Sequence, residues 1–504
     1  MRTIAHWSVL GSLVGLLSAC GVAPSEGSFE AVAESSSPLL LTGAKWPDAG
    51  IHVCFETRLA SDGSGNSKNP HTRADWATLF NLVRDTANAS WGRAANLYFY
   101  GFEDCASNVA SNNPGTIAIN LARYDGEGGN TDIGYSSSRW TRMRLDPSQN
   151  GFDGQIMHEF GHALGFSHEW DRADNPHNTG CTVADGNSVG KTSDYLGTKL
   201  DIPSIMNYSY DQGAPGCALP RPFRLSAWDI VGVQNAYGRK RAGQIVNPFN
   251  LCVDIPLPYD GSGAWLQTFA CNGNTNQRFR WLNTSQLYAP AYANAFMDVP
   301  AGTTTPGQQI HTFSQNSPAS ANQQWVFRSV QVKGIGDKCL SAQSFAVGSL
   351  LVTRECNGAA DQAWTVNANS GQMSISSGSQ TLCAELPNGN EASGSFLRLV
   401  SCTGGTAQRF SLTNLGEIKF VNQCFDVVGG DVSDGRAIQM YSCKAASDRS
   451  KVNQQWHFSG AIHSALASNL CVDVRGASRS YRAAVQTYTC NGAENQTWDY
   501  YFYR

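Results

Sequence analysis

The chain has 504 residues, which is too long for one hydrophobic core and predicts about three domains. Lys and Arg number 36 against 40 Asp and Glu, without a block of one sign, so the charge pattern argues against a nucleic-acid groove or a polybasic membrane patch. Charged residues make up 15% of the chain, below the usual share of roughly 25%, and 50 glycines are present, which is typical of turn-rich β structure outside the cell.

The first twenty residues have the composition of an export signal. Arg2 precedes an apolar run over 4–17 that is too short to span a bilayer, and the run ends in "LSAC". This ending resembles the lipobox of bacterial lipoproteins, which implies that Cys20 is acylated and anchors the protein at the outer membrane or cell surface. Simple cleavage and secretion is the alternative. Residues 21–44 are small and polar, and are expected to form a flexible tether or a short pro-segment.

Cysteine spacing predicts disulfides made in an oxidising compartment. Without Cys20 fourteen cysteines remain, and ten of them fall into five pairs separated by 17 or 19 residues: Cys252/Cys271, Cys339/Cys356, Cys383/Cys402, Cys424/Cys443 and Cys471/Cys490. The other four pair most simply as Cys54 with Cys105 and Cys181 with Cys217.

Residues 45–240 are predicted to form an α+β domain. Strands are expected over 50–56, 96–102 and 115–124, and an amphipathic helix over 72–91. A helix with three histidines and a long polar loop follow. A last helix is bounded by Ser226 and Asp229 at its start and by Gly238 at its end.

The segment "HEFGHALGFSHE" over 158–169 carries three histidines at spacings that suit one metal ion. His158 and His162 lie one helical turn apart on the same face, and Gly165 lets the chain leave the helix so that His168 can be a third ligand. Three protein ligands leave one coordination position open, which is typical of catalytic zinc, and Glu159 stands beside the ligands as a candidate general base.

This segment, together with "SIMNY" over 204–208, resembles the metzincin metallopeptidases and among them most closely the astacins. The resemblance implies a zinc metalloendopeptidase with one catalytic Zn²⁺, in which Met206 forms an apolar floor under the metal. It also implies that Tyr208 is a catalytic fifth ligand that stabilises the oxyanion, and that the strand around 115–121 aligns the substrate. Trp170 stands where astacins usually have glutamine, and we find neither of the clan's inhibitory propeptide switches.

From about residue 243 the chain is a repeat, in which Gln-x-Trp or Gln-x-Phe occurs six times at intervals of 39 to 46 residues. With a cysteine before an acidic residue in most copies, the pattern resembles ricin-B-type β-trefoils. The expected fold is therefore a metzincin domain followed by two all-β trefoils, at 243–368 and 370–504.

A sugar site needs a carboxylate, an aromatic face and amides that orient the hydroxyls. Repeats one, five and six supply such sets, namely Asp254, Gln267, Phe269 and Asn276; Asp426, Gln439, Tyr441 and Asn453; and Asp473, Gln486, Tyr488 and Asn495. Repeat two is weaker, with Asp298, His311, Phe313 and Asn322. Repeats three and four are expected not to bind sugar, because they have Ser341 with Arg354 and Glu385 with Val400.

These patterns together predict an exported zinc metalloendopeptidase that cleaves proteins or peptides and is carried to glycans or glycoproteins by its trefoils. Its contact with a membrane would be by the lipid anchor alone. The alternative is a surface lectin or adhesin whose metzincin domain no longer cuts.

Overall fold

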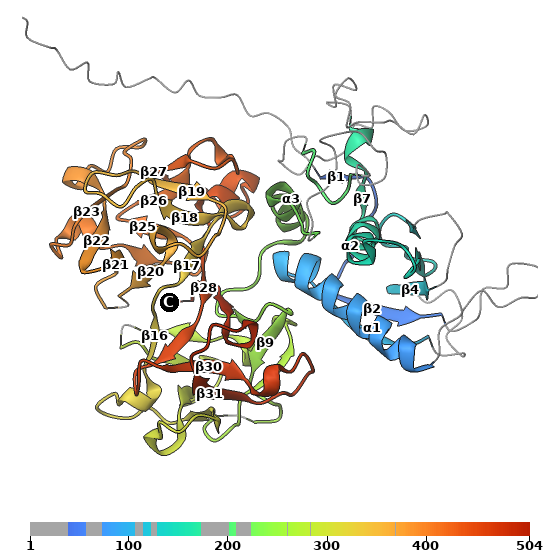
Figure 1. Ribbon diagram of the computed structural model, residues 1–504, viewed down its shortest axis with the longest axis horizontal. Coiled ribbons are helices and arrows are strands. Elements are labelled where there is room, and N and C mark those ends of the chain that lie inside the picture. Colours follow the sequence, from blue (N-terminus) through green and yellow to red (C-terminus); the bar gives the residue numbers. More distant parts are fainter. Residues whose placement is uncertain are drawn as a thin grey trace, which may run out of the picture. The chain divides into compact units, whose positions relative to one another are not determined.

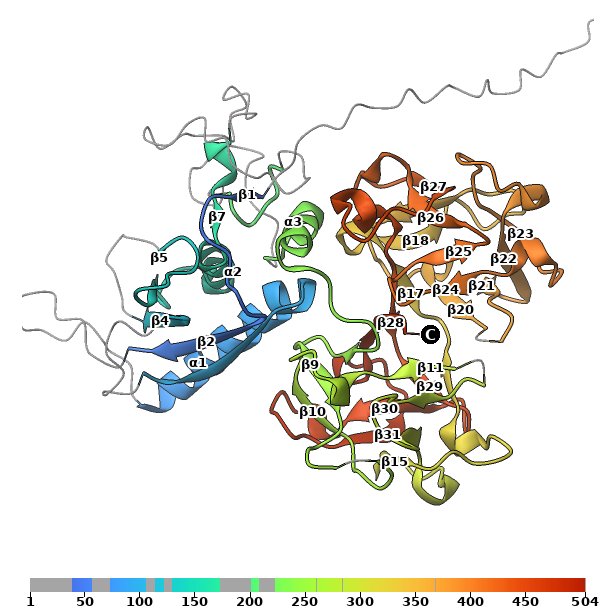
Figure 2. The ribbon, with the colours of Figure 1, turned by 180° about the vertical axis from the view of Figure 1, so that it is seen from behind.

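The computed structural model describes residues 39–56, 73–105, 114–121, 129–172, 201–207, 223–259, 261–282, 284–367 and 369–503. They form a multidomain protein, with an α+β domain first and two all-β trefoils after it in the chain (Figures 1 and 2). Within these ranges, no helix combines the length and the apolar character needed to cross a bilayer.

The α+β domain is built on a five-stranded sheet in the order β3-β2-β4-β6-β5. Four strands are parallel and β5 is antiparallel to its neighbour β6. The strands are β2 (Gly50–Phe55), β3 (Tyr98–Asp104), β4 (Thr116–Leu121), β5 (Asn130–Thr131) and β6 (Thr141–Leu145). The prediction that the strand around 115–121 aligns the substrate is wrong, because β4 is hydrogen-bonded on both sides, to β2 and β6. The edge next to the candidate site belongs to β5.

Residues 39–44, expected to lie in a tether, belong to the folded domain. Strand β1 (Leu40–Leu41) pairs antiparallel with β7 (Phe166–Ser167), directly after the histidine helix. Leu39 and Leu40 are fully buried. Apolar side chains at the end of a polar segment gain more from burial than from solvent exposure, so the domain begins at least six residues before the predicted boundary.

The described part of this domain also holds three α-helices, and two of them carry residues of the candidate site. Helix α1 (Arg73–Ala87) continues into a π-helical turn, η1 (Asn88–Gly92). Helix α2 (Phe152–Ala163) carries the first two histidines and is buried along almost all of its length. Helix α3 (Ala227–Tyr237) begins at the predicted capping box of Ser226 and Asp229 and ends at Gly238, which has a φ of 78°.

Strand pairing divides the six repeats differently from the prediction of 243–368 and 370–504. The last strand of repeat two, β16, pairs with the first strand of repeat six, β29, and the last strand of repeat six, β32, pairs with β8 at the start of repeat one. In the same way β28, at the end of repeat five, pairs with β17 at the start of repeat three. Repeats one, two and six therefore close the first trefoil, and repeats three, four and five close the second.

The second trefoil is thus inserted between repeats two and six of the first, and strands β9, β30 and β31 lie in one lobe in both views (Figures 1 and 2). The strands of the first trefoil are β8 (Ile245–Val246), β9 (Leu251–Asp254), β10 (Gln267–Ala270), β11 (Arg280–Trp281), β12 (Leu287–Tyr288), β13 (Phe296–Asp298), β14 (Gln308–Gln309), β15 (His311–Phe313), β16 (Trp325–Phe327), β29 (Ile462–Ser464), β30 (Leu470–Val474), β31 (Val485–Thr489) and β32 (Trp498–Tyr500). Those of the second are β17 (Gln331–Lys333), β18 (Cys339–Ala342), β19 (Leu351–Arg354), β20 (Trp364–Val366), β21 (Met373–Ser377), β22 (Gln380–Glu385), β23 (Arg398–Ser401), β24 (Ser411–Leu412), β25 (Ile418–Phe420), β26 (Gln423–Val427), β27 (Arg436–Ser442) and β28 (His457–Gly460).

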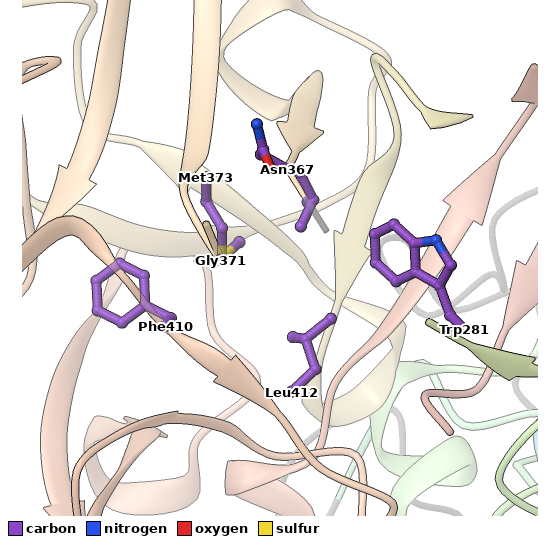
Figure 3. A pocket seen from close by; sticks show the side chains of 7 residues that line it. Trp281, Asn367, Gly371, Met373, Phe410 and Leu412 are labelled. Atoms are coloured by element: carbon purple, nitrogen blue, oxygen red, sulfur yellow. The ribbon is translucent and has the colours of Figure 1, made fainter. Parts of the chain in front are cut away.

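The Gln-x-Trp elements pack the trefoil cores. The four tryptophans of the motif are at most 1% exposed, and each donates its indole N–H to a backbone carbonyl of its own repeat: Trp325, Trp364, Trp456 and Trp498. An apolar recess lined by Trp281, Met373, Phe410 and Leu412 has about 0 Å³ of free volume, so it belongs to the packing and cannot hold a ligand (Figure 3).

Each repeat except repeat two contains a disulfide bond, as the spacing of the cysteines predicts. All five predicted trefoil pairs are formed, and Cys54 is bonded to Cys105 in the α+β domain. Cys20, Cys181 and Cys217 lie outside the described residues. Six disulfides are typical of a protein from an oxidising, extracellular environment.

Candidate metal centre and glycan sites

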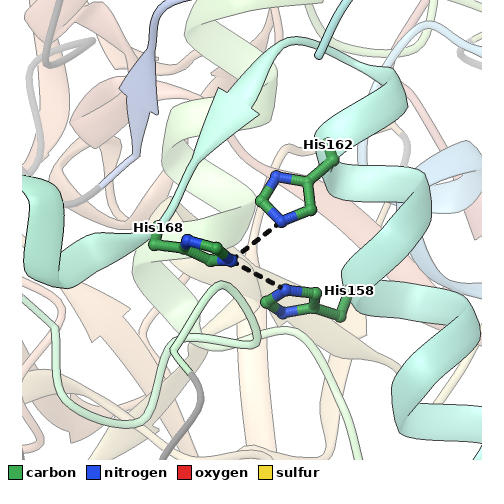
Figure 4. Close-up of side chains that lie close together, drawn as sticks. All are labelled: His158, His162 and His168. Atoms are coloured by element: carbon green, nitrogen blue, oxygen red, sulfur yellow. Dashed lines mark hydrogen bonds between the residues drawn. The ribbon is translucent and has the colours of Figure 1, made fainter. Parts of the chain in front are cut away.

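Three imidazole rings converge at one point, two from helix α2 and one from the segment after β7. The Nε2 atom of His168 lies 3.3 Å from Nε2 of His158 and 3.0 Å from Nε2 of His162 (Figure 4). The Nδ1 atoms of His158 and His162 each lie 2.7 Å from a backbone carbonyl oxygen, those of Ile205 and Phe166. Because a carbonyl only accepts, both Nδ1 atoms hold the proton, and both Nε2 atoms present a lone pair to the centre.

This arrangement fits a zinc ion. Lone pairs that face one another at this distance repel unless a cation lies between them. Two nitrogens bound to tetrahedral zinc at about 2.0 to 2.1 Å would be about 3.3 Å apart, close to the observed spacing. Burial, and then the neighbouring His162, lower the pKa of His158 to about 3, so its ring stays neutral at ordinary pH, as a metal ligand must.

The segment before Met206 is held by the capping carboxylate of helix α3. Asp229 accepts hydrogen bonds from the Ser204 hydroxyl at 2.6 Å and from the Ile205 amide at 2.9 Å, in addition to its bond from the Ser226 amide. The carbonyl of Ile205 in turn orients His158. Burial raises the pKa of Asp229, and these hydrogen bonds oppose the shift. The sequence marks Asp229 as a helix cap, but its second role cannot be read from local spacing.

Met206 is fully buried and packs against helix α2. A Cβ atom on Gly161 would lie 2.2 Å from the Met206 sulfur, so the close approach of the two segments requires glycine at this position. The role of Met206 as an apolar floor under the metal stays a prediction. Tyr208, the predicted fifth ligand, lies outside the described residues.

Glu159 follows His158 on helix α2, and its carboxylate contacts the edge strand β5. Its Oε2 atom accepts a hydrogen bond of 2.7 Å from the Thr131 hydroxyl, and a Cβ atom on Gly129 would lie 2.3 Å from its Oε1 atom. Burial raises the pKa of Glu159 to about 8, and the bond from Thr131 works against this rise. The sequence analysis missed both contacts, because no pattern relates positions 28 and 30 residues apart.

Glu169, which follows the third histidine, is fully buried and serves as an anchor in the described structure. One of its carboxylate oxygens lies 3.4 Å from the backbone amide of Asp201 and 3.9 Å from Nε of Arg172. Burial raises the pKa of Glu169, and the neighbouring guanidinium opposes that rise. This network joins the end of the histidine segment to the loop that leads to Met206.

The predicted aspartates of repeats one, five and six have the same surroundings. Each accepts hydrogen bonds from the predicted Gln and Asn and also from the Gln of the Gln-x-Trp motif, a role for that Gln which the sequence analysis did not assign. In repeat one, Asp254 accepts from Gln267 at 2.9 Å, Asn276 at 2.8 Å and Gln277 at 3.0 Å. In repeat five, Asp426 accepts from Gln439 at 3.0 Å, Asn453 at 2.9 Å and Gln454 at 2.9 Å. In repeat six, Asp473 accepts from Gln486 at 2.8 Å, Asn495 at 2.6 Å and Gln496 at 3.1 Å.

The aromatic faces of these sites differ in their exposure. Tyr441 is 44% and Tyr488 43% exposed, whereas Phe269 is half-buried beside Tyr481 with ring centroids 5.0 Å apart. Burial raises the pKa of each aspartate, while the amide donors lower it. Repeats five and six therefore offer an open aromatic face beside a carboxylate whose position is fixed.

Repeat two keeps the carboxylate but changes its partner. Asp298 lies 2.8 Å from Nε2 of His311 and accepts a 2.7 Å hydrogen bond from Asn322. The His311 ring stacks on Trp265 and on Phe313, with ring centroids 5.2 and 5.4 Å away, and these two residues are 45% and 44% exposed. The exposed Trp265 belongs to repeat one, so sequence comparison of single repeats could not place it here.

Both the trefoil part and the α+β part of the chain are similar to known proteins, but to different degrees. The model of the ricin-type beta-trefoil lectin domain matches residues 241–364, 293–384 and 371–498, which together cover just over half of the chain. A zinc metalloproteinase of Caenorhabditis elegans, nas-3, is 36% identical over 92 residues, which are 16% of this chain and 32% of that protein. The chain thus spans about a third of the length of this relative.

Two solved structures are similar over single parts of the chain. High choriolytic enzyme 1, a hatching enzyme zinc-protease of Oryzias latipes, is 19% identical and covers 39% of this chain and 94% of its own, with a TM-score of 0.26. A non-toxic homologue of type II RIPs from Momordica charantia, in complex with α-methyl-D-galactoside, is 16% identical and covers 43% of this chain and 96% of its own, with a TM-score of 0.22. On the match of its repeats, which extends over more than half of its length, the chain belongs to the family of proteins with the ricin-type β-trefoil lectin domain.

Proposed function

We propose that the protein is an exported zinc-dependent metalloendopeptidase that its trefoils bring to glycans or glycoproteins. The observation that carries the proposal is the convergence of the Nε2 atoms of three histidines on one point beside helix α2, which also carries Glu159. A zinc ion held there would supply electrophilic activation of a water molecule and of the scissile carbonyl.

The chain's own residues account for the proton transfers and for substrate alignment. Glu159 accepts the proton of the attacking water and passes it to the leaving amine. Strand β5 forms the edge of the sheet next to Glu159, so an extended peptide can pair with it as an added strand. Tyr208 as oxyanion stabiliser and Cys20 as the lipid anchor remain parts of this proposal.

Metal analysis combined with a cleavage assay tests the proposal. Purified protein is expected to contain about one zinc ion per chain and to cleave an unfolded protein; a chelator should abolish cleavage, and added zinc should restore it. A protein that binds glycan columns but holds no zinc and cleaves nothing would instead be a lectin or adhesin with an inactive metzincin domain.

Replacing Thr131 by Val is expected to lower kcat by roughly tenfold with little change in KM, because it removes a hydrogen bond that fixes the Glu159 carboxylate without altering side-chain volume. Thr131→Ser keeps the hydroxyl and should retain most of the activity. Steady-state kinetics on one peptide substrate check both variants. Equal losses in the two variants would mean that the hydroxyl is not what matters.

Removing the aspartates of repeats five and six is expected to abolish retention on a neutral glycan column. Because Asp426 and Asp473 lie in different trefoils, each single Asp→Asn variant should weaken retention less than the double variant does. The paired variant Tyr441→Ala with Tyr488→Ala changes only exposed side chains and should also lose retention, with an unchanged melting temperature. Full retention in both double variants would contradict the choice of sites.

A further inference from the structure

A hollow of about 290 Å³ opens in repeat three of the second trefoil, where the sequence predicts no binding. Phe345, Arg354 and Asp361 line it, and Ser344 and Ser377 contribute hydroxyl groups. Its volume lies near the lower end of small-molecule sites, which run from about 300 to 1,000 Å³, and suits one sugar ring. The Phe345 ring packs partly on the trefoil core and so offers a fixed apolar wall.

Arg354 takes the place that an aromatic residue has in repeats one, five and six. Strand register sets it opposite Cys339, and the corresponding position opposite Cys252, Cys424 and Cys471 is held by Phe269, Tyr441 and Tyr488. Its guanidinium is oriented by two backbone carbonyls, those of Ala342 at 3.4 Å and Gln343 at 3.3 Å. With 36% of the side chain exposed, this fixed cation faces the hollow and solvent.

Repeat three also has a carboxylate, but it comes from a different position of the repeat. Ser341 stands where repeats one, five and six have aspartate, and Asp361 precedes Gln362 where those repeats have asparagine. The Ser341 hydroxyl donates to Asp361, so donor and acceptor have exchanged positions. The Asp361 side chain is 24% exposed, whereas that of Asp426 in repeat five is 5% exposed, so Asp361 is more open to a ligand.

We propose that this hollow binds a sugar residue that carries an acidic group, either a carboxylate or a sulfate ester. The Arg354 guanidinium donates paired hydrogen bonds to the acidic group. Asp361 accepts from ring hydroxyls, and Phe345 covers the apolar face of the ring. The proposal extends the lectin part of the proposed function, and it does not depend on the peptidase.

Structural stability does not account for these residues. The Arg354 nitrogen and the Asp361 oxygen are 3.7 Å apart and partly exposed, and ion pairs of this kind contribute little to folding. A pair that served only to pack the repeat would fill the space between its groups, whereas these residues border a hollow. An acidic sugar would give both residues a ligand group, namely its acidic group for Arg354 and its hydroxyls for Asp361.

The test measures the full chain on immobilised monosaccharides of three kinds: carboxylated (glucuronate, galacturonate and N-acetylneuraminate), sulfated, and the neutral counterparts. At least one acidic sugar is expected to bind about tenfold or more tightly than its neutral counterpart, and the arm that does so identifies carboxylate or sulfate as the ligand. Arg354→Gln should remove this preference and leave binding of neutral sugars unchanged. Arg409→Gln removes the same charge from an exposed position of the same trefoil and should preserve the preference.

Ser344→Trp fills the hollow without altering its charge and should also abolish acidic-sugar binding, which keeps the test valid if Arg354→Gln does not fold. No preference for any acidic sugar, or a preference that survives both variants, would overturn the proposal. Full neutral-glycan retention in the Asp426/Asp473 variant would count against the proposed function instead, so the two failures are distinguishable.

Discussion

Replacing Glu159 by Gln is expected to reduce peptide hydrolysis by about 10² to 10⁴-fold while the histidine site keeps its zinc. Glutamine has nearly the same shape and its amide oxygen can still accept the hydrogen bond from Thr131, but it cannot take up a proton from water. His158 and His162 are oriented by backbone carbonyls and not by Glu159, so metal binding should be unchanged.

Kinetics on a fluorogenic peptide and zinc content by mass spectrometry check this expectation together. Glu391→Gln removes the same charge at an exposed position of the second trefoil and serves as the matched control, with unchanged turnover. If Glu159→Gln kept full turnover, Glu159 would not be the base. If it lost zinc as well as turnover, the carboxylate would have to be assigned to metal binding instead.

Much of the metal centre could be predicted from the sequence, because its ligands follow local geometry. Two histidines four residues apart on a helix share a face. Gly165, three residues before His168, has a φ of 100°, which few other residues adopt. The supporting contacts could not be predicted, because Thr131 and Asp229 reach the centre only through the tertiary arrangement of sheet and loop.

The repeats show the same division between local and long-range information. Cysteine spacing predicts each disulfide, and the Gln-x-Trp pattern predicts the trefoil fold, because both act within one repeat. Nothing in one repeat indicates which other two close a barrel with it. The exchange of Ser341 and Asp361 was missed for a related reason. When the repeats are compared one position at a time, Ser341 indicates only that the aspartate is missing, and Asp361 indicates only that the asparagine is missing.

The interlaced order of the repeats leads to the second large effect. Residues 329–461, cut out as a separate polypeptide, are expected to fold cooperatively, because they hold all three repeats of the second trefoil with their strand pairs and three disulfides. Residues 370–504 are the second trefoil as predicted from the sequence, and they contain repeats four, five and six. This polypeptide lacks strands β17, β18 and β19, which belong to repeat three and are needed to close the barrel. This second polypeptide should show no cooperative thermal transition.

A new disulfide in the full chain tests the same order without removing any residue. Gln308 on β14 lies opposite Thr487 on β31, so cysteines at these two positions should form a bond between repeat two and repeat six. In a chain whose first three repeats closed one trefoil and whose last three closed another, these positions would belong to different barrels and the bond would not form. Mass spectrometry of the non-reduced digest distinguishes the outcomes, and a cysteine pair at Gln308 and Arg398, which lie in different trefoils, is the matched control that should stay reduced.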